Sequence, residues 1–147
     1  MSGIVCAIRG GPDSQPTISQ SIALAQKTGQ IIYFLYVVNL DFLSHTATSR
    51  TRVVQHEMQE MGEFILLTAQ TQALDKGANA EIVVREGQVG EEIIAFCLSV
   101  QADYVILGRP RGQAEADVFT HERLDQFAQH IQQESRAKVV LAKVDSQ

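Results

Sequence analysis

Short apolar runs alternate along the chain with longer segments in which apolar residues recur at helical spacing. The runs are continuous, a pattern typical of strands buried on both faces of a sheet. The most pronounced run covers residues 31–38, where aromatic and β-branched side chains favour a strand over a helix. The predicted strands are Ile4–Ile8, Ile31–Val38, Glu81–Val84, Tyr104–Leu107 and Val139–Ala142.

Helices are predicted between these strands. The first has Pro16 in its opening turn and ends at Gly29. The second is long and ends near residues 76–77, and the third opens with Glu91 and Glu92, which the positive end of the helix dipole favours. The positions predicted to face the core are Ile18, Ile22 and Ala25 in the first helix; Val54, Met58, Met61, Ile65 and Thr68 in the second; Ile93, Ile94, Cys97 and Leu98 in the third; and Leu124, Phe127, Ala128 and Ile131 in the fourth.

Strict alternation of strand and helix predicts a parallel sheet covered by helices on both faces. Right-handed crossovers restrict the strand order to a few possibilities, and periodicity alone does not choose among them. A length of 147 residues suits one core, and no repeat or low-complexity linker interrupts the chain. We therefore expect a single α/β domain spanning residues 1–147.

Composition narrows the function classes. The formal net charge of −5 argues against non-specific binding to nucleic acid or to anionic membranes. No signal peptide precedes the first strand, and no apolar run reaches the roughly 18 residues that a membrane helix needs. A cytoplasmic protein without nucleic-acid or membrane partners is expected. Cys6 and Cys97 lie inside apolar runs, which predicts buried free thiols rather than a disulfide.

Two of the apolar runs stop at glycine-containing loops. Residues 4–8 are followed by Arg9 and Gly10, and Tyr104–Leu107 is followed by the loop 108–112. In open parallel sheets, loops of this kind form the ligand crevice at the carboxyl ends of the strands. If the two loops meet, Arg9, Arg109 and Arg111 converge, and their planar guanidinium groups suit a phosphate or a carboxylate. The alternative is neutralisation within the loops by Asp13, Asp41, Glu115 or Asp117.

Other catalytic chemistry finds little support in the sequence. The histidines show no metal-ligand spacing with Cys, Asp or Glu, so no metal site is predicted. The serines lack a Gly-x-Ser-x-Gly context, which argues against a hydrolase nucleophile. Asp103 and Glu86 are interpreted as turn and cap residues. No catalytic residue is predicted, and the chain is not expected to be an enzyme.

Four segments together resemble the universal stress protein family. They are the opening strand and turn at 4–10, the strand end at 35–38, the Glu-Gly turn at 85–93, and the Ala-Asp-strand-Gly-loop segment at 102–112. The resemblance implies a five-stranded parallel sheet in the order 3-2-1-4-5, with the two loops of the crevice next to each other. It implies a nucleotide or anion site that includes Gly10, Val38, Gly108 and Gly112 beside the three arginines.

The resemblance also implies that homodimers form through the last strand. An apolar edge strand left open is an aggregation hazard, and two-fold antiparallel pairing removes it. The flanking lysines are an alternative protection for a monomer. The candidate interface residues are Val139, Val140, Leu141, Ala142, Lys143 and Val144.

The chain departs from the nucleotide-binding pattern of that family. Arg9 stands where the pattern has aspartate, Arg111 stands at the second loop glycine, and the later Gly-Ser or Gly-Thr pair falls at residues 121–123, where this chain has no glycine. A β-carbon there blocks the approach of phosphate to bare backbone. We therefore expect a non-catalytic regulatory or stress-response binding protein without the usual ATP site and without a bound cofactor. A nucleotide- or anion-binding sensor and a nucleotide hydrolase remain as alternatives.

Overall fold

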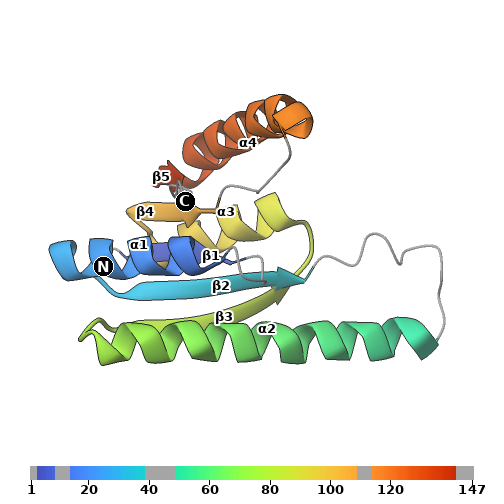
Figure 1. Ribbon diagram of the computed structural model, residues 1–147, viewed down its shortest axis with the longest axis horizontal. Coiled ribbons are helices and arrows are strands. Elements are labelled where there is room, and N and C mark those ends of the chain that lie inside the picture. Colours follow the sequence, from blue (N-terminus) through green and yellow to red (C-terminus); the bar gives the residue numbers. More distant parts are fainter. Residues whose placement is uncertain (1–2, 9–13, 39–48, 109–113, 142–147) are drawn as a thin grey trace.

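The computed structural model describes residues 3–8, 14–38, 49–108 and 114–141. Within them, strands and helices alternate along the chain (Figure 1). The elements in chain order are β1 (Ile4–Ala7), α1 (Ser14–Thr28), β2 (Ile32–Val38), α2 (Ser49–Asp75), β3 (Ala80–Glu86), α3 (Val89–Val100), β4 (Tyr104–Leu107), α4 (Ala114–Ser135) and β5 (Lys138–Leu141).

The strands form one parallel sheet in the order β3-β2-β1-β4-β5, which confirms the predicted topology. β1 lies in the middle, with Ala7 level with Leu35 on one side and with Leu107 on the other. β3 and β5 are the edge strands. The observed strands differ from the predicted ones by one or two residues at their ends, except for β4, which coincides with the prediction.

Helices cover both faces of the sheet, as the continuous apolar strands predict. α1 and α2 pack on one face over Ile4, Cys6 and Phe34, and α3 and α4 pack on the other over Val5 and Leu35 (Figure 1). Because successive residues of a strand point to opposite faces, a strand buried on both faces needs an apolar residue at every position. The central strand meets that demand, since Ile4, Val5 and Cys6 are fully buried.

α1 ends as predicted. Its last residue, Thr28, is followed by Gly29 at φ +73°, and the Gly29 amide donates to the Ala25 carbonyl at 2.7 Å. Both cysteines are buried free thiols, also as predicted.

Two predicted core positions in α2 are wrong. Met61 of α2 is 59 % exposed, and the buried face of that helix is formed instead by Gly62, Leu66, Ala69 and Ala73, with Met58 and Ile65 at its margin. Thr68 is exposed as well. The helix carries apolar residues on two faces, and spacing alone did not indicate which one meets the sheet.

In α3, Leu98 is half exposed, while Phe96 takes the buried position beside Ile93 and Cys97. Phe96 lies edge-on to Tyr33 of β2, with ring centroids 5.4 Å apart. Such an edge-to-face aromatic pair fixes the rotation of α3 over the sheet.

α2 approaches β2 closely at Gly62. A methyl group at that position would fall 2.8 Å from Cε2 of Tyr36 and nearer still to Cδ2. Tyr36 is 8 % exposed and forms part of the core on this face. The missing side chain at residue 62 therefore sets the distance between the helix and the sheet.

We expect Gly62→Ala to destabilise the protein. In a helix interior, replacing glycine by alanine ordinarily raises the free energy of unfolding by about 1 kcal/mol. Overpacking a buried contact lowers it by about 1–3 kcal/mol, and here the contact is with a ring that has little room to move. The urea-unfolding midpoint measures the net effect. The matched control is Tyr36→Ala, in whose background Gly62→Ala should turn neutral or stabilising. If the effects of Gly62→Ala and Tyr36→Ala on the free energy of unfolding are additive in the double variant, the predicted contact is contradicted.

Candidate functional site

The candidate crevice lies at the carboxyl ends of β1 and β4. These strands are neighbours, but the chain leaves β1 for α1 on one face and β4 for α4 on the other (Figure 1). Parallel α/β sheets bind their ligands at such a topological switch point, outside the carboxyl ends of the strands. The sheet therefore brings together the starts of the two loops that the sequence analysis selected.

Only part of the predicted site lies within the described residues. Val38 and Gly108 do: Val38 is the last residue of β2, and Gly108 directly follows the last residue of β4. The remaining candidates, Arg9, Gly10, Arg109, Arg111 and Gly112, fall outside the described residues. The same holds for Ala142, Lys143 and Val144 of the predicted dimer interface, while Val139, Val140 and Leu141 are described and partly buried.

Gly108 packs against α1. A β-carbon at this position would stand 2.7 Å from Oγ1 of Thr17, a residue that is 2 % exposed. This is closer than a β-carbon and an oxygen can approach, so the Thr17 side chain, the helix or the strand end would have to shift. The packing of α1 over the end of β4 thus accounts for a glycine here, independently of any ligand.

Beneath this contact lies a small buried polar cluster. The Ser21 hydroxyl donates to the Thr17 carbonyl at 2.8 Å, and the Cys6 thiol lies 3.9 Å from the same oxygen. Burial raises the pKa of the Cys6 thiol to about 12, although its hydrogen bond with Ser21 acts in the opposite direction. Burial likewise raises the pKa of Cys97 to about 12. Because the thiolate is the reactive form, burial disfavours a nucleophilic or redox-sensitive role for either cysteine near neutral pH.

Val38 ends β2 with a fully buried side chain. Its carbonyl oxygen accepts a hydrogen bond from the Gly87 amide at 3.1 Å. That bond ties the end of β2 to the turn between β3 and α3. At the carboxyl end of β2, the Val38 carbonyl therefore already has a partner within the fold.

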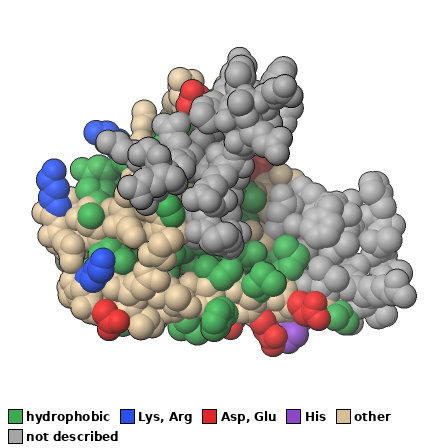
Figure 2. Space-filling model, viewed as in Figure 1, with side chains coloured by type: hydrophobic (Ala, Val, Ile, Leu, Met, Phe, Trp, Pro, Cys, Tyr) green, Lys and Arg blue, Asp and Glu red, His purple; other side chains and the backbone are tan. Residues whose placement is uncertain are grey.

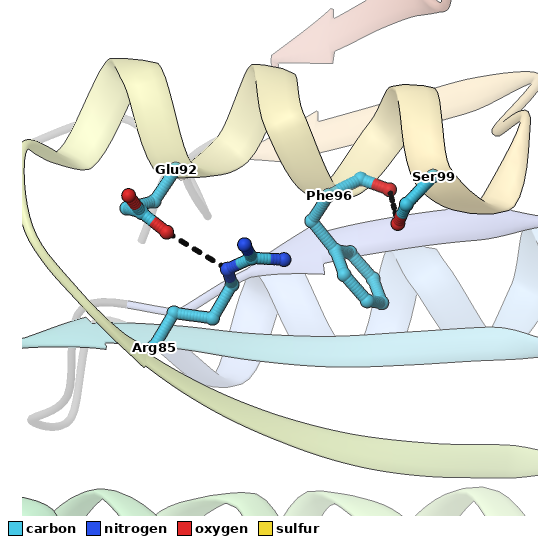
Figure 3. A network of polar contacts seen from close by, with 4 residues as sticks. All are labelled: Arg85, Glu92, Phe96 and Ser99. Atoms are coloured by element: carbon cyan, nitrogen blue, oxygen red, sulfur yellow. Dashed lines mark hydrogen bonds and ion pairs between the residues drawn. The ribbon is translucent and has the colours of Figure 1, made fainter.

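The turn after β3 carries an ion pair (Figure 3). Nε of Arg85 donates to Oε1 of Glu92 at 2.8 Å, and the guanidinium carbon lies 5.8 Å from the centre of the Phe96 ring. The pair joins the last part of β3 to the first turn of α3, and the aromatic face beneath the cation adds a favourable electrostatic contact. The ion pair therefore holds the carboxyl end of β3 against α3, at the same edge of the sheet as the carboxyl ends of β1, β2 and β4.

Sequence reasoning missed Thr17, Ser21 and Arg85 as residues that shape this edge. The ion pair had a detectable signal, because Arg85 and Glu92 carry opposite charges on the two sides of a glycine turn. Thr17 had none, since its role depends on how α1 lies over β4.

The structure shows no metal-binding cluster within the described residues, where no group of three or more His, Cys, Asp or Glu side chains is suitably placed. His56 pairs with Glu60 at 2.9 Å on the exposed face of α2. His45 and His121 lie outside the residues whose side chains are described. In the described part of the chain, no helix combines the length and apolarity needed to cross a lipid bilayer.

Comparison with known proteins identifies relatives over nearly the whole chain. The model of the "Universal stress protein family" matches residues 1–143. Among solved structures, universal stress protein UspA from Lactobacillus plantarum superposes with a TM-score of 0.73 at 14% identity, over 97% of each chain. No curated protein matches the chain.

Two further similar structures contain a nucleotide. One is the universal stress protein from Archaeoglobus fulgidus in complex with dAMP, with a TM-score of 0.63, 16% identity, and coverage of 97% of this chain and 98% of that one. The other is a universal stress protein family protein from Arabidopsis thaliana with AMP bound, with a TM-score of 0.62, 14% identity, and coverage of 99% of this chain and 94% of that one. At these identities the likeness shows the fold alone.

We expect Gly108→Ala to lower stability by about 1–3 kcal/mol, because the new methyl group is forced against the buried Thr17 hydroxyl. Thr17→Ala removes the obstructing oxygen, so the cost of Gly108→Ala should fall substantially in that background. Urea unfolding of the four proteins of the cycle measures the coupling. A Gly108→Ala variant as stable as the wild type would instead indicate a glycine that the packing does not need.

Proposed function

Because the chain belongs to the universal stress protein family, we propose that it is a non-catalytic regulatory or stress-response binding protein that does not hold ATP in the family's usual way. The observation that carries the proposal is the absence of any glycine after Gly112 in the sequence. A triphosphate held by backbone amides needs residues without a β-carbon where it approaches the loop and the following helix. Here the sequence has His121 and Glu122 in that stretch, and neither is a glycine.

The described strand ends support the same proposal. The close approach of Thr17 explains Gly108, and the Val38 carbonyl is bonded to the Gly87 amide. Cys6 is held as a neutral thiol by burial, which raises its pKa. These groups build a packed sheet edge, and none of them supplies an activated nucleophile.

A second candidate is a sensor of nucleotides or anions. It is favoured by the two similar structures that contain dAMP and AMP. A nucleoside monophosphate carries one phosphate, which two or three arginine side chains can bind without a glycine-lined loop. In this alternative Arg9, Arg109 and Arg111 replace the backbone contacts that the lost glycines provided.

A thermal-shift series separates the two candidates. We expect ATP to leave the melting temperature unchanged, because a ligand stabilises only when it binds the native state. If AMP or inorganic phosphate raises it, the sensor is favoured, and the shift should vanish in a variant with Arg9, Arg109 and Arg111 all changed to Gln. The matched control is Lys27→Gln, which removes a positive charge from the last turn of α1, away from the carboxyl ends of the strands. The shift should persist in this variant. A shift with ATP that persists in the triple variant would contradict both candidates.

We also propose that the protein forms a homodimer through β5. Within the described residues, β5 pairs with β4 alone, and Val139, Val140 and Leu141 are only partly buried. The outward amide of Val139 is at present bonded by Oε1 of Gln132 in α4, at 3.1 Å. Pairing with a second copy would replace that side-chain oxygen by a carbonyl of the partner strand.

Two substitutions on β5 and α4 test the dimer. Gln132→Ala frees the Val139 amide, so we expect tighter self-association in sedimentation equilibrium. Val139→Pro removes the same amide without touching the ladder to β4, so it should weaken self-association strongly. Wild-type affinity in both variants would exclude the β5 edge as an interface.

A further inference from the structure

Each edge strand of the sheet has a side-chain hydrogen bond to the helix that precedes it in the chain. Nε2 of Gln70 in α2 donates to the Ala80 carbonyl of β3 at 2.9 Å. Oε1 of Gln132 in α4 accepts a hydrogen bond from the Val139 amide of β5 at 3.1 Å. The bond at β3 lies at the opposite edge of the sheet from the proposed dimer interface.

The Ala80 carbonyl points away from the sheet. At the start of the ladder between β2 and β3, the Ile32 amide donates to the Asn79 carbonyl at 3.0 Å, and Ile32 is level with Ala80. In a regular parallel ladder, every second residue of an edge strand directs its backbone groups to the neighbouring strand. The odd-numbered residues of β3 therefore face β2, and the even-numbered ones, from Ala80 to Glu86, direct their backbone groups outward. Gln70 thus occupies a position at which an added strand would place an amide.

α2 is bonded to β3 at both ends of the strand. Besides the bond from Gln70, Nε2 of Gln59 donates to the side-chain carboxylate of Glu86, the last residue of β3. Figure 1 shows α2 running along β3, on the opposite side of the molecule from β5. Natural sheets protect their edges with a covering helix or with polar and charged side chains. α2 and its two glutamines provide β3 with protection of both kinds.

An open β3 edge would be an aggregation hazard. On α2, Phe64 is 71 % exposed, Leu74 54 % and Leu67 49 %. Figure 2 shows hydrophobic side chains at the surface on the side of the molecule where α2 and β3 lie. Apolar surface near an open strand edge favours pairing with other chains. If copies paired symmetrically through β3 as well as through β5, they would form an unlimited ribbon instead of a closed dimer.

From these contacts, we propose that Gln70 caps the β3 edge: by occupying the outward Ala80 carbonyl, it keeps β3 from pairing with β3 of a second copy. An amide of an added strand would have to displace the glutamine amide from that carbonyl, so cap and partner compete for one acceptor. The resulting limit to a dimer rests on the proposed β5 interface. The cap itself does not, because three inner strands separate the two edges.

The test variant is Gln70→Met, which keeps the length and the helix propensity of the side chain and removes its amide. The matched control is Gln26→Met. Nε2 of Gln26 in α1 donates to the Lys76 carbonyl at 2.9 Å, a bond of the same kind and length, but that carbonyl directly follows α2 and belongs to no strand. Both variants lose one bond from a glutamine amide to a backbone carbonyl, and only Gln70→Met opens a strand edge.

Sedimentation equilibrium in the Val139→Pro background, in which β5 cannot pair, isolates the β3 edge. We expect the association constant to be about tenfold or more higher for Gln70→Met than for Gln26→Met, because each of the two copies loses a competing bond. With Val139 intact, Gln70→Met should assemble beyond the dimer. If it associates in the Val139→Pro background but stops at the dimer when Val139 is intact, the cap is supported and the β5 interface fails. Equal association of the two variants would overturn the cap.

Hydrogen exchange at the amides of β3 identifies the surface through which copies associate. The amides of Ile82 and Val84 point outward, whereas the Val83 amide faces β2. In Gln70→Met, we expect exchange at Ile82 and Val84 to slow as the protein concentration rises, while exchange at Val83 stays unchanged. Association without slower exchange at Ile82 and Val84 would mean that another surface pairs, and it would overturn the proposal.

Discussion

The burial of β1 on both faces of the sheet is the constraint on which the rest of this structure depends. Ile4, Val5 and Cys6 have no solvent exposure, and a strand pairs with β1 along each side. A central strand buried in this way has to be apolar at every position, and both faces of the sheet have to be covered by helices. The chain satisfies this by sending α1 and α2 to one face and α3 and α4 to the other. As a consequence of that packing, the carboxyl ends of β1 and β4 form the topological switch point, where open α/β sheets bind their ligands.

The glycines of this sheet edge illustrate how packing and ligand binding can require the same residue type. Gly108 lies where a phosphate-binding loop would begin, and it also lies against the buried Thr17 side chain of α1. The packing reason alone is sufficient to explain the glycine. In the loop that follows, the sequence has glycine only as far as Gly112, together with Arg109 and Arg111. Membership of the family thus accounts for the architecture, whereas the proposed function depends on the residues that this chain has at the loop positions.

The sequence predicted the elements well where one physical signal dominates. The continuous apolar runs located every strand of the described sheet, and the topology followed from the family resemblance. β3 is longer than predicted because Arg85 belongs to an edge strand, where a polar side chain can pair with Glu92 without leaving the ladder. Met61 was misplaced because α2 has two apolar faces, and periodicity does not distinguish a face that meets the sheet from one that meets solvent. The contact between Gly108 and Thr17 joins residues distant in the chain, and no local pattern encodes it.

The most direct way to find out whether the crevice receives a triphosphate is an NMR titration of uniformly ¹⁵N-labelled protein with ATP, followed at the backbone amides of Gly108, Gly87 and Ile8. We expect these signals to stay in place at every ATP concentration, because the described strand ends are occupied by contacts within the fold. Saturable shifts at Gly108 and Ile8, together with shifts in the loop that ends at Gly112, would contradict the loss of the usual ATP site.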